Sequence, residues 1–320
     1  MAHAYIGISG WRYGPWRGTF YPEDLAQKNE LFFASRQVNS IEINGSFYSL
    51  QTAKSYQAWY EATPADFVFS MKGGRFITHM RRLKDVEKPL ANFFASGVLA
   101  LREKMGPIVW QFPPNFQWDE ERFEAFFKLL PRDMASAAKL AGKHDQKIKG
   151  GAWMEVDRNR ELRYAVEVRH ASFENEAFVK LLRRENVAVV VADTAGKWPL
   201  MEDVTADFVY VRLHGDEELY VSGYTKEALD AWGKKVRAWV KGGEAPGAKR
   251  VGKKAVARKG GRDVFIYFDN DVKVRAPVDA RGLMQRVGLK VNEEREVGMG
   301  SEEARRSWPG VRRRKKLGDS

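Results

Sequence analysis

The 320-residue chain contains no cysteine. It therefore has no disulfide bond, no cysteine nucleophile and no cysteine-bound zinc, as is usual in the reducing cytoplasm. Its longest apolar run, residues 187–192, is much shorter than the ~20 residues that span a bilayer. The first residues, MAHAYIGISGW, lack the basic start and long apolar stretch of a secretory signal. We therefore expect a cytoplasmic protein with no membrane segment.

The net charge of +12 is concentrated in two segments. Residues 241–262 carry eight basic side chains and one acidic, and residues 305–317 carry seven basic and no acidic ones. Each segment contributes +7, which leaves −2 for the rest of the chain. Basic segments of this kind attract RNA, DNA or other anions through counterion release, or only keep a protein soluble. Both interpretations stay open for 241–262 and 305–317.

Eight short stretches have the pattern of β-strands: 5–10, 40–44, 67–72, 107–112, 164–169, 187–193, 208–214 and 264–269. Other stretches have apolar residues at helical spacing: 23–37, 86–104, 119–130, 174–185, 226–239 and 279–287. Strands that alternate with helices indicate parallel βα units. Eight such strands within about 270 residues are the number found in a (β/α)₈ barrel.

We therefore predict an α/β protein with one domain, a (β/α)₈ TIM-like barrel over residues 1–288. A doubly wound open sheet is the alternative, but no glycine-rich phosphate fingerprint follows the first strand. Residues 194–206 have the pattern of a loop, so we expect the barrel to be irregular there. Residues 139–163 form a predicted polar insertion and 241–262 a basic insertion. We expect 289–320 to be a disordered basic tail.

Alternate residues of a barrel strand point into the barrel. This rule places many polar and charged side chains inside, mostly near the C-terminal ends of the strands, where TIM-barrel active sites lie. Buried charges must pair, bind an ion or meet a ligand. The predicted inward residues are Ser9, Trp11, Glu42, Asn44, Ser70, Lys72, Gln111, Glu167, Arg169, Asp193, Tyr210, Arg212, His214, Tyr267 and Asp269. This set indicates either a functional cluster or a purely structural ion network.

His214 is the only histidine at the inward end of a predicted strand. Because histidine transfers protons near neutral pH, we assign His214, Glu167 and Glu42 as catalytic residues in general acid–base chemistry. The cations Lys72, Arg169 and Arg212 suit a phosphate or carboxylate group. We predict a hydrolase or isomerase that acts on an anionic, phosphate-bearing substrate.

Further residues at the predicted mouth are candidates for substrate binding. The rings of the first two βα loops could stack on a sugar or base, or form a hydrophobic lid. Asp193, at the end of the sixth strand, shares its side with Val189 and Val191. Together with Lys72, Arg169 and Arg212, the predicted substrate-binding residues are Trp11, Asn44, Tyr48, His79, Gln111, His170, Asp193 and Asp269.

Other functions remain as alternatives. A nucleic-acid-associated binding protein would use the two basic segments, and a degenerate barrel would serve as a scaffold. No HxH or HExxH pair is present, so we predict no metal or other cofactor. A pair of glycosidase carboxylates such as Glu42 and Glu167 is also possible. The admissible metal ligands are Glu42, Glu167, His170, Asp193, His214 and Asp269.

Seven stretches, in order along the chain, resemble the DUF72 (YecE-like) family: GISGWRYGPWRGTFYP, IEINGSFY, FVFSMKGGRFITH, GPIVWQFPPNF, YAVEVRHASF, VYVRLHG and VFIYFDND. The resemblance covers nearly all of residues 5–287 and implies a TIM-barrel fold. It implies no reaction, because the family has no known function. The family's motif residues map onto Gly10, Trp11, Glu42, Asn44, Phe47, Tyr48, Lys72, His79, Gln111, Pro113, Pro114, Glu167, Arg169, His170, Asp193, Arg212, His214, Gly215, Asn270 and Asp271.

The chain departs from the family's pattern at three positions. Gly45 stands where Thr or Ser is usual, Phe173 where Trp is usual, and Asp269 where Asn is common. The charge at position 269 is therefore not expected to be shared by the family. The basic insertion 241–262 and the residues after 288 lie outside the pattern.

Overall fold

Eight parallel strands form a closed barrel in the computed structural model, which describes residues 1–216, 222–270 and 274–291. Each strand pairs with the next one in sequence, and the last pairs with the first. The predicted (β/α)₈ fold is therefore confirmed. The strands are β1 (Ala4–Ser9), β2 (Ser40–Ile43), β3 (Val68–Lys72), β4 (Met105–Gln111), β5 (Tyr164–Glu167), β6 (Val187–Asp193), β7 (Phe208–Leu213) and β8 (Asp263–Phe268).

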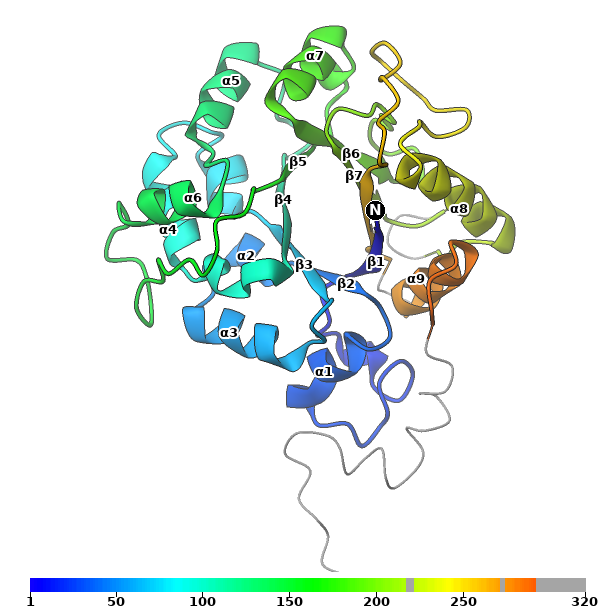
Figure 1. Ribbon diagram of the computed structural model, residues 1–320, viewed down its shortest axis with the longest axis horizontal. Helices are drawn as coiled ribbons and strands as arrows, with labels where there is room; N and C mark the ends of the chain where they lie inside the picture. The colour runs from blue at the N-terminus through cyan, green and yellow to red at the C-terminus, as the bar shows by residue number, and fades with distance from the viewer. Residues whose placement is uncertain (217–221, 271–273, 292–320) are drawn as a thin grey trace, which may run out of the picture.

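Helices surround the strands (Figure 1). The α-helices are α1 (Glu30–Ala34), α2 (Gly45–Tyr48), α3 (Ala53–Ala62), α4 (Glu87–Ala95), α5 (Glu120–Leu129), α6 (Met134–Ala141), α7 (Glu176–Glu185), α8 (Lys226–Val240) and α9 (Arg275–Arg286). Shorter turns are η1 (Gly14–Trp16), η2 (Gln27–Asn29), the π-helix η3 (Phe76–Met80), η4 (Val98–Lys104) and η5 (Ala171–Phe173). None of the described helices is long and apolar enough to cross a membrane.

Side-chain caps set where several outer helices begin. In α3, α5, α6, α7 and α8 the residue before the helix accepts a hydrogen bond from a backbone N–H of the first turn. Such caps satisfy N–H groups that have no partner inside a helix. The capping residues are Thr52, Asp119, Asp133, Asn175 and Thr225.

The helices differ from the sequence prediction in four places. Of the predicted helix 23–37, only Glu30–Ala34 is α-helical, preceded by the turn η2. The predicted helix 86–104 is broken at Gly97, whose φ of 118° and close approach to Ala53 tolerate no side chain. The prediction missed α3, because only two of its residues, Ala53 and Tyr56, are buried and its apolar pattern is weak. It also missed α6, which includes the first residues of the predicted insertion 139–163.

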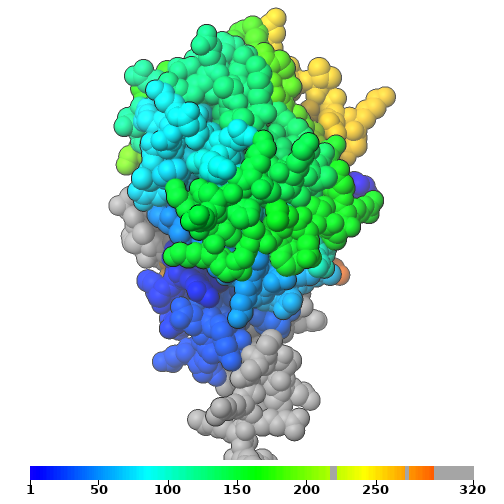
Figure 2. Space-filling view, turned by 90° about the vertical axis from the view of Figure 1, so that its left-hand side faces the viewer, coloured from blue at the N-terminus to red at the C-terminus, as the bar shows by residue number. Residues whose placement is uncertain are grey.

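Residues 142–163, all of them described, contain no helix or strand. They pack against the outside of the barrel: Trp153 N donates to Ala95 O of α4 over 2.8 Å, and Asn92 Nδ2 donates to Asp145 Oδ1 over 3.0 Å. Figure 2 shows this insertion, in green, across one side of the molecule beside cyan and blue atoms of earlier elements. The insertion therefore covers part of the outer surface of the barrel beside α4.

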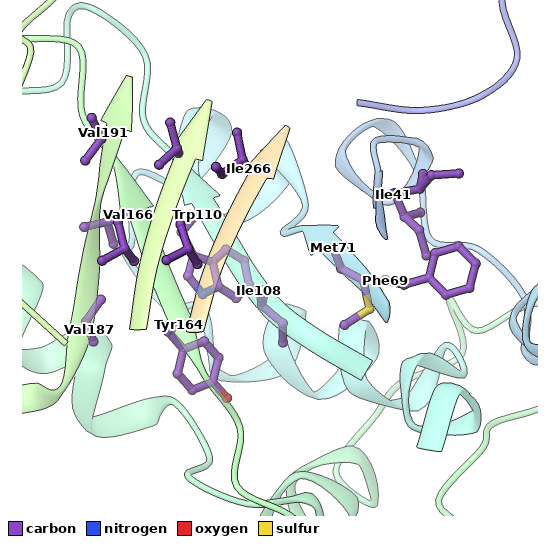
Figure 3. Close-up of a cluster of buried hydrophobic side chains, with 14 of the residues drawn as sticks. Ile41, Phe69, Met71, Ile108, Trp110, Tyr164, Val166, Val187, Val191 and Ile266 are labelled. Atoms are coloured by element: carbon purple, nitrogen blue, oxygen red, sulfur yellow. The ribbon is translucent and has the colours of Figure 1, made fainter. Parts of the chain in front are cut away.

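Two apolar layers flank the strands. The outer layer packs between strands and helices, and Figure 3 shows part of it, including Ile41, Phe69, Met71, Ile108, Trp110, Tyr164, Val166, Val187, Val191 and Ile266. The inner layer fills the barrel with Val109, Ala165, Ala188, Val190, Ala192, Phe208, Tyr210, Phe265 and Tyr267. Alternate strand residues therefore separate as the period of two predicts. Above the inner apolar layer, at the C-terminal ends of the strands, the interior becomes charged.

One side of the barrel lacks a regular helix. Residues 194–206, which join β6 to β7 and are all described, form a loop as predicted. The basic insertion 241–262, in yellow beside α7 and α8 in Figure 1, covers this side. Buried Asp203 accepts hydrogen bonds from Val251 N (2.9 Å) and Gly252 N (2.8 Å), and Glu202 Oε2 accepts one from Lys249 N (2.9 Å).

Most of the predicted tail, including residues 305–317, lies outside the described residues. The predictions for these residues therefore stay predictions.

Candidate functional site

Arg212 of β7 is the centre of a buried ion network, with 1% of its side chain exposed. Its Nη1 donates to Glu167 Oε2 of β5 over 2.7 Å. Its Nη2 lies 3.0 Å from Glu42 Oε1 of β2 and 2.8 Å from Asp269 Oδ2, just after β8. One guanidinium therefore joins three carboxylates from different parts of the barrel. Its planar fork of donors suits this arrangement.

Glu167 also accepts two further donors. Its Oε1 lies 2.8 Å from both Gln111 Nε2 and Arg169 Nε. Strand register brings Gln111 and Glu167 side by side on β4 and β5. Burial alone would raise the pKa of Glu167, but the charges of Arg169 and Arg212 hold it well below its usual range. Glu167 is therefore an ionised group at neutral pH.

Glu42 is held by hydroxyl groups as well as by Arg212. Ser9 Oγ donates to Glu42 Oε1 over 2.9 Å, and the register of β1 and β2 pairs these two residues. Tyr210 OH donates to Glu42 Oε2 over 2.6 Å and lies 2.6 Å from Ser70 Oγ. Burial and the nearby Glu42 carboxylate raise the pKa of Tyr210 well above its usual value. The phenol therefore remains a donor to the carboxylate.

His214 follows β7 and is completely buried. Its Nδ1 lies 3.1 Å from Asp269 Oδ2, and its ring meets the Trp198 ring edge-on with centroids 6.5 Å apart. Burial would raise the pKa of Asp269, but Arg212 and the nearby His214 lower it to about 2. An ionised carboxylate therefore lies beside the imidazole.

Lys72, the last residue of β3, is 9% exposed. Its Nζ lies 4.3 Å from the centre of the Phe47 ring, and among the described residues no carboxylate forms an ion pair with it. Burial, and to a lesser extent the charge of Arg212, lowers the pKa of Lys72 to about 8. Lys72 thus differs from Arg169 and Arg212, whose charges are paired with carboxylates.

His79 lies beside the same ring, on the π-helix η3. Its ring meets Phe47 edge-on with centroids 5.1 Å apart, and its Nδ1 lies 2.9 Å from Thr78 Oγ1. Burial, followed by the charges of Lys72 and Arg169, lowers the pKa of His79 to about 4. His79 is therefore a neutral imidazole at physiological pH.

The connection from η3 to α4 has an unusual backbone. Arg82, Leu83 and Asp85 have φ values of 49°, 67° and 50°, in the left-handed region that residues other than glycine rarely adopt. Strained residues and π-helical turns both concentrate at functional sites. This connection follows β3 and therefore lies at the same end of the barrel as Lys72.

The remaining predicted residues lie outside the ion network. Trp11 is buried against Trp59 (5.2 Å between ring centroids), and with Asn44 it lines a cavity of about 260 Å³. Tyr48 is 70% exposed on the surface. His170 caps η5, since its Nδ1 accepts from Ser172 N over 3.1 Å.

The prediction that Asp193 belongs to the interior charges is wrong: it points away from the network, on the outward side of β6 with Val189 and Val191, because it shares their alternation along the strand. Its Oδ2 accepts from Tyr224 OH over 3.2 Å, and burial raises its pKa. Arg169, which pairs with Glu167 inside the network, also stacks on Trp198 at 3.8 Å. Sequence reasoning missed Trp198 and Tyr224, because both lie in irregular segments without strand periodicity.

The charges of the network balance. Three acids (Glu42, Glu167 and Asp269) face three permanent or titratable cations (Lys72, Arg169 and Arg212), with His214 in addition. In the described part of the chain no three His, Asp or Glu side chains converge as a metal site requires. The carboxylates instead satisfy arginine and hydroxyl donors.

Fold and site together define a (β/α)₈-barrel protein with a buried ion network at the C-terminal end of its strands. Residues 5–302 match the family described as "Protein of unknown function DUF72", so the chain belongs to the DUF72 family. The resemblance drawn from the sequence is confirmed.

Solved structures support the fold. A DUF72 family protein of Thermotoga maritima superimposes with a TM-score of 0.65 at 21% identity, covering 88% of this chain and 98% of that one. One from Enterococcus faecalis gives 0.63 at 15% identity, covering 90% and 96%. The UPF0759 protein YunF of Bacillus subtilis is 28% identical over 122 residues, 37% of this chain and 42% of that relative's length.

Proposed function

We propose that the protein is an enzyme, a hydrolase or isomerase, that transfers protons at the C-terminal end of the barrel and acts on an anionic, phosphate-bearing substrate. The observation that carries the proposal is the contact of His214 Nδ1 with Asp269 Oδ2 at 3.1 Å inside a balanced ion network. A carboxylate in this position fixes the orientation of the imidazole ring. His214 is then the general acid or base.

Glu42 and Glu167 act as positioning residues in this proposal. Both are bound to Arg212, and Glu167 is also bound to Arg169, so the low pKa of Glu167 makes it a poor proton acceptor. The two carboxylates hold the Arg212 guanidinium in place. Arg212 in turn holds Asp269 against His214.

The substrate anion would be attracted by Lys72 and Arg169. Three carboxylates already surround Arg212, whereas 13% of the Arg169 side chain is exposed and no carboxylate pairs with Lys72 among the described residues. A desolvated ammonium that lacks a direct carboxylate partner gains from binding a phosphate. Lys72 is thus the cation of the network best suited to a new anion.

Mass spectrometry and ³¹P NMR of small molecules that copurify with the native protein test the proposal. We expect a phosphate-bearing compound that is bound by the wild type and lost from Lys72→Met. His214→Asn and Asp269→Asn should keep this compound but fail to turn it over. His144→Asn, which changes a histidine in the polar insertion 139–163, is the matched control. A bound compound that every variant converts normally would refute the assignment.

A second candidate function is non-specific nucleic-acid binding by the basic insertion, favoured by seven exposed basic side chains on an anchored loop. They are Lys241, Lys249, Arg250, Lys253, Lys254, Arg258 and Lys259. The eighth, Arg262, is buried and donates to Val256 O over 2.7 Å. Binding of duplex DNA or RNA should weaken steeply with salt, and should be lost when these seven residues are changed to Gln. Unchanged binding in that variant would show that the basic insertion is not the nucleic-acid binding site.

A further inference from the structure

We infer that the ε-amino group of Lys72 is a nucleophile that forms an imine with a carbonyl group of the substrate, so that the substrate is an anionic aldehyde or ketone. The inference rests on the proposed function, because it places the reacting carbonyl at the same end of the barrel as His214. It adds a covalent step at Lys72, leaves the anionic group of the substrate to Arg169, and narrows the substrate class.

The surroundings of Lys72 favour an amine rather than a fixed cation. The side chain leaves the end of β3 and is buried, and its Nζ lies 4.3 Å from the centre of the Phe47 ring, which offers no oxygen acceptor to the ammonium. No carboxylate among the described residues pairs with the ammonium. Lysine nucleophiles are activated in this way, by desolvation and by neighbouring cations. Here the neighbouring cation is Arg212.

Lys104 shows the contrasting case within the same chain. It is 4% exposed, but its Nζ donates to Tyr60 O (2.6 Å), Thr63 O (2.9 Å) and Thr63 Oγ1 (3.2 Å). Three oxygen acceptors satisfy its three ammonium donors. Lys104 is therefore a structural lysine, and burial alone does not distinguish it from Lys72.

Charged groups from several elements face Lys72. Burial disfavours its charged form, Arg212 adds to this, and the carboxylates act in the opposite direction without contacting it. The titratable and charged groups around it are Glu42 of β2, His79 of η3, Glu167 and Arg169 near the end of β5, Arg212 of β7 and Asp269 after β8. An iminium carries the same charge as the ammonium that it replaces. The balance of the network is therefore unchanged when the covalent bond forms.

The step balances with groups already in the site. The lone pair of the neutral amine attacks the carbonyl carbon, and a proton moves from nitrogen to oxygen to give a carbinolamine. His214 in its protonated form then gives one proton to the hydroxyl group, which leaves as water. A C=N double bond remains, with one hydrogen on the positively charged nitrogen. No oxidant or reductant is required, and hydrolysis reverses the step.

Reductive trapping of the full-length protein tests the inference. The probes are pyruvate, glyoxylate and dihydroxyacetone phosphate, each with sodium cyanoborohydride, and peptide mass spectrometry locates the adduct. The pKa of about 8 gives Lys72 roughly a hundredfold more neutral amine near pH 7.5 than an exposed lysine has. We expect at least about tenfold more adduct at Lys72 than at exposed Lys54, with a pH midpoint near 8.

Two variants and one control separate the inference from the proposed function. Lys72→Arg and Lys72→Met should both lose the adduct, while Lys104→Met should keep it at Lys72; thermal melting identifies any variant that does not fold. Lys72→Arg keeps the cation and should still bind inorganic phosphate. Labelling of surface lysines without labelling of Lys72 would overturn the covalent step for these carbonyls and leave the phosphate result intact. Loss of phosphate binding only in Lys72→Met would support the proposed function independently.

Discussion

The Arg212 guanidinium donates to Glu167 over 2.7 Å, and neither side chain is accessible to solvent beyond 1%. This contact crosses the interior of the barrel from β7 to β5. Because Arg212 also binds Glu42 of β2, one side chain cross-links three strands that are not neighbours in the sheet. The network therefore contributes to the rigidity of the barrel as well as to the electrostatics of the site.

Arg212→Met should strongly destabilise the protein. The substitution leaves three carboxylates without their shared partner, and breaking a buried ion pair in this way costs about 3–5 kcal/mol. Urea denaturation at pH 7 measures the free energy of unfolding. Arg81→Met removes an exposed ion pair with Asp85 and is the control, with a loss below about 1 kcal/mol. Equal effects of the two substitutions would contradict the described network.

The stability that Asp269 contributes should disappear in acid. Its pKa of about 2 in the folded state is lower than in the unfolded chain, so the contribution is present above about pH 4 and is lost as pH falls through 2. We expect the difference in unfolding free energy between the wild type and Asp269→Asn to fall by about 2 kcal/mol between pH 5 and pH 2. Denaturant titrations across this range measure it. A constant difference would mean that Asp269 titrates normally.

Lys72 should destabilise the folded protein while its amine is charged, and this destabilisation should disappear at alkaline pH. Its pKa falls from 10.5 to about 8 on folding, so the unfolded chain binds more protons between these values and stability rises with pH. The free energy of unfolding of the wild type minus that of Lys72→Met should rise by about 3 kcal/mol from pH 8 to 10.5. The buried tyrosines are present in both proteins, so their titration cancels. A flat difference would contradict the lowered pKa.

Asp203→Ala should release part of the basic insertion. Asp203 accepts the backbone N–H groups of Val251 and Gly252, and without it this segment should open locally more often. Limited digestion with trypsin should then cut within 241–262 about tenfold faster. Asp230→Ala, which removes an ion pair between α8 and Arg286, is the control and should leave the cleavage rate unchanged. Equal rates in both variants would show that the insertion has other anchors.

Sequence periodicity predicted the barrel because strands buried on both faces have strong, short patterns. The rule that alternate residues of a barrel strand point inward also placed Glu42, Glu167 and Arg212 inside the barrel. In the structure, Arg212 contacts both carboxylates directly. The alternation of side chains along a strand fixes whether a residue points into the barrel or toward the helices. It does not fix which of several carboxylates an arginine or histidine contacts.

The partner of His214 shows this limit. The sequence grouped His214 with Glu167 and Glu42, whereas the structure places its Nδ1 beside Asp269, since β7 and β8 are neighbours in the sheet. The contact of Arg169 with Trp198 was beyond sequence reasoning for another reason. Residues 194–206 have no regular spacing of apolar residues, so no rule indicates where a side chain in that loop points.

The basic insertion has a consequence for how the domain can be divided. Ala245 belongs to the outer apolar layer, and Ala248, Val251 and Ala255 pack against it, on the side where β6 is followed by a loop. A segment between β7 and β8 thus takes the place of the helix missing between β6 and β7. A protein shortened to the strands and their helices would leave part of the outer apolar layer beside β6 and β7 uncovered. Any search for a minimal folding unit must therefore keep this segment.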